Sequence, residues 1–264
     1  MTSVARWLAA LTSLAPLQPR PLAADEVFFA EARILSPVRV RVPDSKKEGR
    51  PPLVVGLHGR GGTAQALAGV WEAFRDPKPV LVVPEAPYPL LVRAEQSTMG
   101  WSWDFPSSDR TLWAQADPLV VRYVLDVARE ARKKHVTGGV YLLGHSQGVA
   151  YAYMAAVQDP DLVSGIIAFA GILPSEVLSE DSLRAVAGKL RVFIAHGQQD
   201  EALDPKESKR AKDILSRLGF SVTYREFQGG HGLSSDALRQ AQAWMADGER
   251  MRLRDVGPRE DTLR

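Results

Sequence analysis

Three residue types that together can activate a hydroxyl group occur in this chain in the order Ser146, Asp200, His231. A serine hydroxyl is a poor nucleophile at neutral pH, so it needs an imidazole to accept its proton and a carboxylate to orient that imidazole. The order Ser, Asp, His is one of the chain orders in which such a triad occurs. It predicts nucleophilic attack by Ser146, with His231 as the base and Asp200 as the orienting acid.

The surroundings of Ser146 support a reactive role more strongly than its motif does. Ser146 lies in "GHSQG", a G-x-S-x-G pattern that could also be an ordinary turn. "GGVYLL" before it predicts a short strand, and "VAYAYMAAV" after it predicts a helix. A strand, a sharp turn and a helix form a nucleophile elbow, in which Gly144 and Gly148 leave room for the close backbones.

Five histidines make the search for the base short. His231 lies in "FQGGHGLSSD", a glycine-flanked loop between the last predicted strand and the last predicted helix. That is where a doubly wound α/β sheet is expected to present the base of such a triad, although an exposed loop histidine is the alternative. The remaining four are expected to shape a loop, to pack beside the elbow, to end a strand and to close a helix: His58, His145, His196 and His135.

Two aspartates compete for the orienting role. Asp200 in "AHGQQDEALDP" follows the carboxyl end of a predicted strand, where catalytic groups collect in open α/β sheets. Asp204 precedes Pro205 and is typical of a helix start, with the aspartate as its cap. This division favours Asp200 as the catalytic carboxylate.

Two backbone N–H groups are needed to stabilise the oxyanion of an acyl-transfer intermediate. One comes from the residue after the nucleophile, here Gln147, and the other from an early loop between a strand and a helix. The glycine-rich "HGRGG" provides such a loop and predicts the amide of Arg60 as the second donor. The alternative for "HGRGG" is an ordinary tight turn.

Composition sets the class of protein. The 264 residues suit one large α/β domain, and 45% hydrophobic with 24% charged residues is ordinary for a globular protein. The net charge of +2 implies no nucleic-acid or acidic-lipid partner. The absence of cysteine excludes disulfides, thiolate metal sites and a cysteine nucleophile. No apolar run is long enough to span a bilayer.

The chain is predicted to have three parts. Residues 1–30 are expected to form a short amphipathic helix and a proline-rich linker, 31–247 the α/β domain, and 248–264 a charged tail that frays. A signal peptide is the alternative for the first segment, but Thr12 and Ser13 interrupt its apolar run and no A-x-A spacing follows. A cytoplasmic location is therefore expected.

Short apolar runs alternate with helical patterns along the α/β domain. The runs predicted as strands are "VRVRV" at 38, "LVVGLH" at 53, "VLVVP" at 80, "VYLL" at 140, "GIIAFAG" at 165, "RVFIAHG" at 191 and "VTYREF" at 222. The first alternates and favours an edge strand, whereas the continuous runs favour burial on both faces. Helices are predicted after Gly62, Gln147, Pro205 and Ser235, and from Asp117. The alternation predicts a mostly parallel, twisted sheet with helices on both faces.

Two connections depart from this rhythm. Residues 86–116 form a long, irregular segment that four aromatic residues should keep ordered: Trp101, Trp103, Phe105 and Trp113. The segment from Ile172 to Lys189 is too short for a separate cap domain.

A string of motifs in order resembles the phospholipase/carboxylesterase family of α/β-hydrolases, which includes bacterial carboxylesterases and acyl-protein thioesterases. The matching stretches are "LHGRGG" at 57, "PEAP" at 84, "GWSWDF" at 100, "GHSQG" at 144, "GIIAFAGILP" at 165, "AHGQQDEALDP" at 195 and "GGHGLS" at 229. They span roughly residues 51 to 246. Val149, "AFAG" and "EALDP" depart from the family pattern without removing a member of the triad.

The resemblance implies an α/β-hydrolase fold without a large cap and a serine hydrolase that acts on carboxylic esters. It assigns the catalytic triad and the oxyanion donors to the residues named above, and it places Trp101 and Trp103 near the acyl site. The mechanism needs no metal or other cofactor. We expect a small-molecule ester substrate of short to medium chain and a monomer or homodimer.

Thioesterase, lysophospholipase and amidase activities share this machinery and stay open. A protein of another class, an inactive binding module with the same fold, is the remaining alternative.

Overall fold

The computed structural model describes residues 30–31, 34–44, 50–93 and 98–255. The predicted N-terminal helix and linker lie almost wholly outside these residues, as do the last nine residues of the predicted tail. The chain divides into two units, Met1–Leu35 and Ser36–Arg264. Every helix and strand of the described residues belongs to the second unit.

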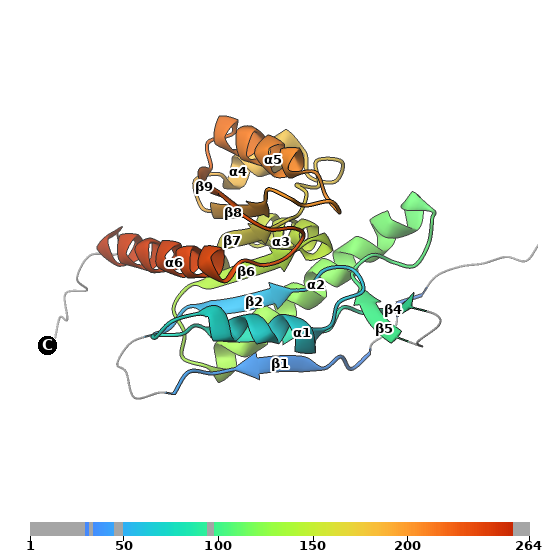
Figure 1. Cartoon of the computed structure of the whole chain (residues 1–264), viewed down its shortest axis with the longest axis horizontal. Helices are drawn as coiled ribbons and strands as arrows, with labels where there is room; N and C mark the ends of the chain where they lie inside the picture. Colours follow the sequence, from blue (N-terminus) through green and yellow to red (C-terminus); the bar gives the residue numbers. More distant parts are fainter. Residues whose placement is uncertain (1–29, 32–33, 45–49, 94–97, 256–264) are drawn as a thin grey trace, which may run out of the picture. The chain divides into compact units, whose positions relative to one another are not determined.

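A seven-stranded sheet forms the centre of the second unit, in the order β1-β3-β2-β6-β7-β8-β9 (Figure 1). Its strands are β1 (Val38–Arg41), β2 (Leu53–Leu57), β3 (Val80–Pro84), β6 (Val140–His145), β7 (Val163–Phe169), β8 (Arg191–Gly197) and β9 (Ser221–Phe227). Among the strand pairs of this seven-stranded sheet, only β1–β3 is antiparallel. The mostly parallel sheet predicted from the alternating pattern is confirmed.

The burial of each strand follows its residue pattern. The continuous apolar strands β2, β3 and β7 are buried at every residue. The alternating β1 is exposed along its length at one edge of the sheet, as predicted. Strands covered on both faces need apolar side chains on both, whereas an edge strand does not.

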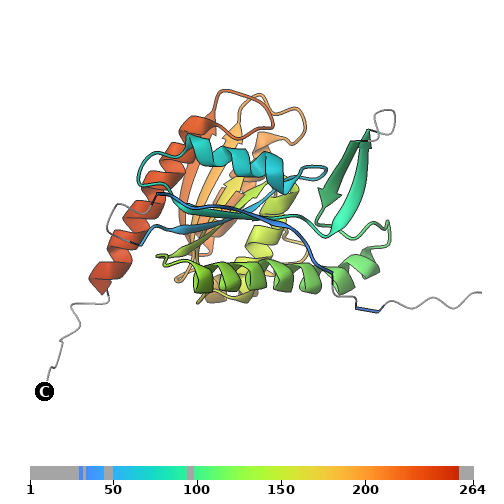
Figure 2. The same ribbon diagram turned by 90° about the horizontal axis from the view of Figure 1, so that it is seen from below.

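Helices cover both faces of the sheet (Figure 2). The helices α2 (Arg110–Lys134), α3 (Gln147–Gln158), α4 (Glu180–Val186) and α5 (Pro205–Arg217) pack on one face. The other face is covered by α1 (Ala64–Ala68), the 3₁₀ helix η1 (Gly69–Ala73) and α6 (Ser235–Asp255). Alternate residues of β2 point into different hydrophobic cores. Leu53 and Val55 belong to the core beneath α2, α3, α4 and α5, and Val54 belongs to the core beneath α1, η1 and α6.

The long connection after β3 contains structure that the sequence analysis missed. Strands β4 (Tyr88–Arg93) and β5 (Thr98–Ser102) form an antiparallel hairpin. Its second strand attaches to the loop after β2, because Gly61 N–H donates to Trp101 O over 2.8 Å and Trp101 N–H donates to Gly62 O over 3.0 Å. This long-range pairing leaves no local signal in the sequence.

The predicted start of α2 at Asp117 is wrong. The helix begins at Arg110, and Asp109 caps it by accepting a hydrogen bond from Thr111 N–H at 2.8 Å. Pro118 therefore lies inside the helix. The early start is stabilised by Trp113, whose Nε1–H donates to Ser107 O over 2.8 Å.

The predicted fraying from Gly248 is also wrong over the described residues, because α6 continues to Asp255. Glu249 anchors this part of the helix to the sheet. Its carboxylate accepts hydrogen bonds from Gly139 N–H at 3.0 Å and from the Tyr141 hydroxyl at 2.8 Å. A composition-based prediction of a solvated tail cannot detect these contacts.

The connection between β7 and β8 contains only α4, a helix of seven residues, which agrees with the predicted fold without a large cap. Among the described residues, none of the helices combines the length and apolar character needed to cross a bilayer. Cellular location and oligomeric state stay predictions.

Candidate active site

Ser146 occupies a strained turn between β6 and α3. Its φ of 53° lies in the left-handed region that disfavours residues with a side chain. Its N–H donates to Phe169 O over 2.9 Å, which fixes the turn against the neighbouring strand β7. A side chain at Gly148 would meet Leu57 O, and one at Gly144 would place Cβ 2.6 Å from Val149 Cα. The strand, strained turn and helix that the elbow requires are all present.

Asp200 and His231 are brought together by the ends of neighbouring strands. Asp200 follows β8, and His231 follows β9. His231 Nδ1 lies 2.7 Å from Asp200 Oδ2, and the Asp200 side chain has 0% exposure against 27% for His231. The half-buried histidine keeps a surface toward solvent while its orienting carboxylate is covered.

The Asp200 carboxyl is held in its charged form. Burial alone would raise its pKa, but hydrogen bonds from His231 and from the N–H groups of Leu203 and Ala202 outweigh burial and hold the pKa below its ordinary value. An ionised carboxylate can only accept, so His231 Nδ1 must carry the hydrogen. This tautomer leaves Nε2 of a neutral His231 able to accept a proton.

Asp204 is occupied elsewhere. Its carboxylate accepts a hydrogen bond from Lys206 N–H at 2.9 Å and caps α5, as the Asp-Pro pair predicts. Of the two aspartates weighed in the sequence, Asp200 is the one that contacts His231.

His145 packs beside the elbow, as expected, and also holds the loop of His231. Its Nε2 lies 3.1 Å from His231 O, and the two rings are 5.1 Å apart. Because a carbonyl oxygen only accepts, Nε2–H of His145 is the donor. Burial lowers the pKa of His145, which favours the neutral ring beside His231.

The two predicted oxyanion donors lie on segments next to the elbow. Gln147 is the first residue of α3, where N–H groups lack helical partners and the helix dipole favours negative charge. Arg60 lies in the loop between β2 and α1. That loop approaches Ser146, since a Cβ built on Gly59 would be 3.2 Å from Ser146 Cβ. Donation by either amide to an oxyanion stays a prediction.

The side chain of Gln147 connects the elbow to the end of the hairpin. Its Oε1 accepts from Trp103 N–H at 3.0 Å, and its Nε2 donates to Ser102 Oγ over 3.1 Å. The elbow and the long connection after β3 are therefore joined at the site, an arrangement that the motif letters did not indicate.

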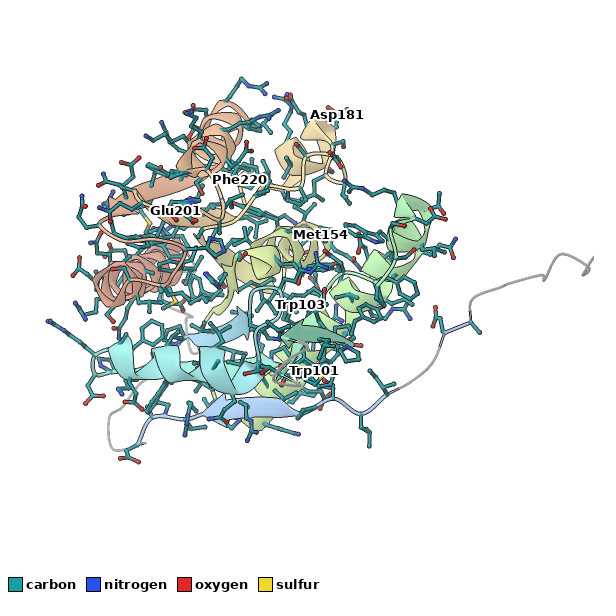
Figure 3. All side chains as sticks on the ribbon, turned by 45° about the vertical axis from the view of Figure 1, so that its right-hand side comes forward. Trp101, Trp103, Met154, Asp181, Glu201 and Phe220 are labelled. Atoms are coloured by element: carbon teal, nitrogen blue, oxygen red, sulfur yellow. The ribbon has the colours of Figure 1, made fainter. Side chains whose placement is uncertain are left out.

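Trp103 is fully buried, and its Nε1–H donates to His58 O over 2.8 Å. Trp101, also labelled in Figure 3, has a half-buried side chain. The observed role of Trp103 is to hold the loop after β2, because its indole has no surface open to solvent. Contact of either tryptophan with substrate stays a prediction.

His58 and Glu85 brace the same loop, and the role of Glu85 was missed. Burial lowers the pKa of His58, so its neutral ring donates from Nδ1 to Gly59 O at 2.9 Å and accepts at Nε2 from Ala86 N–H at 3.2 Å. Glu85 Oε1 accepts from Ala64 N–H, the first residue of α1, at 2.6 Å. His58 shapes the loop as predicted. The available signal for Glu85 was a carboxylate directly after the apolar run "VLVVP", within "PEAP".

His196 was expected only to end a strand. It also contacts the carboxylate of Asp200, with 2.9 Å between Nε2 and Oδ2. Its position at the end of β8, four residues before Asp200, was the signal that could have indicated this contact. In the part of the chain that the structure describes, no group of three or more His, Cys, Asp or Glu residues is arranged to hold a metal ion.

Known proteins share this sequence pattern and fold. Residues 40–247 match the family described as Phospholipase/Carboxylesterase. MhqD of Bacillus subtilis (strain 168) is 28% identical over 191 residues, 71% of this chain and 89% of that protein. Acyl-protein thioesterase 1 of Neurospora crassa is 22% identical over 232 residues, 75% of this chain and 91% of that protein.

Solved structures of known proteins share the fold of this chain. The structure of esterase PE8 is 25% identical with a TM-score of 0.61, over 81% of this chain and 99% of that chain. A carboxylesterase from Mesorhizobium loti is 22% identical with a TM-score of 0.63, over 80% of this chain and 94% of that chain. With the family pattern covering most of the α/β unit, this chain belongs to the phospholipase/carboxylesterase family of α/β-hydrolases.

Proposed function

We propose that this member of the family is a carboxylesterase that cleaves short to medium esters through an acyl-enzyme on Ser146. The observation that supports it best is the 2.7 Å contact between His231 Nδ1 and the buried, ionised Asp200, in a chain that holds Ser146 in a strained elbow. A carboxylate-oriented imidazole is the group that an unactivated serine lacks.

In the proposed mechanism, Nε2 of His231 takes the Ser146 proton as the hydroxyl oxygen attacks the ester carbonyl. The amides of Arg60 and Gln147 donate to the resulting oxyanion. His231 then gives its proton to the leaving alcohol, and a water molecule, deprotonated by the same imidazole, hydrolyses the acyl-enzyme. Asp200 stays ionised throughout and stabilises the imidazolium.

The substrate range follows from what covers the site. The connection after β7 contains only the short α4, so the described residues between β7 and β8 form no domain-sized cap. We therefore place small soluble esters ahead of lipid aggregates. Thioester hydrolysis is the second candidate, because one relative is named an acyl-protein thioesterase and the same triad serves both leaving groups.

The first test measures hydrolysis of p-nitrophenyl acetate, butyrate, octanoate and palmitate by the wild type and by Ser146→Ala. We expect turnover of the shorter esters and a loss of about 10⁴-fold or more in kcat for the variant, because the nucleophile is gone. Circular dichroism controls for folding. Equal rates in the two proteins would contradict the proposal, and a palmitate preference would contradict the substrate range.

A fluorophosphonate probe separates the esterase from an inactive binding module. The probe reacts with an activated serine, so we expect it to label the wild type and not Ser146→Ala. A folded wild type that takes up no probe and cleaves no ester would favour the binding module. Comparing an octanoyl ester with the matching octanoyl thioester then ranks the two hydrolase candidates.

A further inference from the structure

The carboxylate of Asp200 is shared by two histidines. Its Oδ2 lies 2.7 Å from His231 Nδ1 and 2.9 Å from His196 Nε2. Its Oδ1 accepts from the N–H groups of Ala202 at 2.9 Å and Leu203 at 3.0 Å. The backbone donors fix one oxygen in the loop between β8 and α5, and the two imidazoles hold the other between them.

His196 approaches Asp200 from inside the protein. Its side chain has no exposed surface, and its Nε2 faces both Asp200 Oδ2 and, at 3.1 Å, the carbonyl oxygen of Leu203. Both neighbours only accept, so Nε2 carries the hydrogen and donates to Asp200. The donor is therefore buried, oriented and separate from the imidazole assigned to proton transfer.

A second buried contact sets the orientation of the His196 ring. Its Nδ1 lies 2.6 Å from the hydroxyl oxygen of Ser208, a buried residue of α5. With the hydrogen of a neutral ring on Nε2, Nδ1 accepts from the Ser208 hydroxyl. A ring bonded at both nitrogens cannot flip or tilt without losing one of these hydrogen bonds.

The same serine reaches the segment beneath the elbow. Ser208 Oγ lies 3.4 Å from Gly171 O. Gly171 packs so closely on the elbow that a Cβ built on it would be 2.7 Å from Ser146 O. Because its single hydroxyl hydrogen is donated to His196 Nδ1, Ser208 packs against Gly171 O without a hydrogen bond to it. His196 and Ser208 thus fill the space between the Asp200 carboxylate and the segment that packs on Ser146, on a side separate from His231.

We infer that His196 is a positioning residue for the reaction. Its hydrogen bond to Oδ2, with its ring oriented by Ser208, fixes the rotation of the Asp200 carboxylate so that this oxygen faces His231 Nδ1. A carboxylate held only by backbone donors on Oδ1 could turn Oδ2 away from His231. This inference rests on the proposed function, because it assigns the role through Asp200 and His231.

The test compares His196→Leu, which removes the donor, with His196→Gln, whose side-chain amide can donate near the position of Nε2. For His196→Leu we expect kcat on p-nitrophenyl butyrate to fall about tenfold to a hundredfold with KM within about twofold, because a hydrogen bond to a charged group is lost. His196→Gln should keep kcat within about threefold of the wild type. A core-filling role would predict the reverse ranking, since leucine suits an apolar interior better than glutamine.

A serine pair keeps the inference testable if His196→Leu fails to fold. Ser208→Ala removes the hydrogen-bond partner of His196 Nδ1 and should lower kcat by about threefold to tenfold. This loss is smaller because a hydrogen bond between neutral groups contributes less than one to a charged group. The matched control is Ser164→Ala, a buried serine near the start of β7 whose Oγ accepts from Val140 N–H at 3.1 Å. It should leave kcat unchanged even where the melting temperature falls.

Three results would overturn the inference: a folded His196→Leu with wild-type kcat, a His196→Gln as impaired as His196→Leu, or equal kcat in Ser208→Ala and Ser164→Ala. Asp200→Asn and Ser146→Ala, assayed alongside, identify which proposal fails. If these two variants keep activity, the proposed function is wrong. If they lose activity while His196→Leu keeps it, only the positioning role is wrong.

Discussion

Two regions meet at the candidate site, and the sequence predicted the structure of one of them much better than that of the other. The loops after β6, β8 and β9 are short, follow strands of the central sheet and place Ser146, Asp200 and His231 where the sequence order indicates. The connection from residue 86 to 116 was expected to be irregular, yet it holds a hairpin and the first turns of α2. Local sequence patterns predict a segment well where its structure depends on the element next to it in the chain, and poorly where it depends on distant segments.

The contacts of the long connection explain the difference. Trp103 donates to His58 O, and Gln147 accepts from Trp103 N–H. These partners are 45 and 44 residues away in the chain. In contrast, the turn at Ser146 is determined largely by its own glycines and the strand before it.

The largest effect is expected from a substitution in the turn at Ser146, the region whose structure is determined mainly by its local sequence. Gly148→Ala should lower the free energy of unfolding by roughly 3 kcal/mol or more, because the added Cβ meets the backbone oxygens of Leu57 and His58. Urea denaturation measures this effect. Gly188→Ala is the matched control, because nothing lies within 4 Å of a Cβ built there. A loss no greater than that of the control would mean that the elbow tolerates relaxation.

An intermediate effect is expected where the two regions touch. Trp103→Phe removes the hydrogen bond to His58 O and leaves a small gap, so it should lower the free energy of unfolding by about 1–3 kcal/mol. By loosening the loop that carries Arg60, it should also reduce kcat/KM about tenfold.

The control for this prediction is Trp113→Phe, which loses a similar hydrogen bond to Ser107 O within the connection itself. Its ester hydrolysis should stay near that of the wild type. If the two tryptophan variants lose activity equally, the long connection does not act through the loop after β2.

The smallest expected effect concerns pH. Burial holds the pKa of His58 below 6.5, so as pH falls through 6.5 the unfolded chain binds a proton that the folded His58 does not. The free energy of unfolding should therefore decrease between pH 6.5 and the lower folded pKa, and His58→Gln should reduce this decrease. Urea midpoints at pH 7.5 and 5.5 give the comparison. His145 shifts in the same direction, so part of the decrease should persist in the variant. An identical decrease in both proteins would contradict the prediction.

Much of the fold could be predicted because the central strands are buried on both faces and their residues are continuously apolar. The alternating β1 likewise indicated its exposed edge. The start of α2 was misjudged because Asp117-Pro118 looks like a helix start, whereas Asp109 and Trp113 stabilise two earlier turns. The end of α6 was misjudged because Glu249 makes its hydrogen bonds to the sheet.

By itself, the sequence determined the mostly parallel sheet, the elbow and the order of its three candidate catalytic residues, because alternating apolar patterns and glycine-bounded turns act over a few residues. Only the tertiary structure decided how those residues are supported. His196 and Ser208 behind Asp200, and Trp103 against the loop after β2, are contacts between distant segments. Their hydrogen bonds depend on how helices and loops pack around the sheet, which no local pattern specifies.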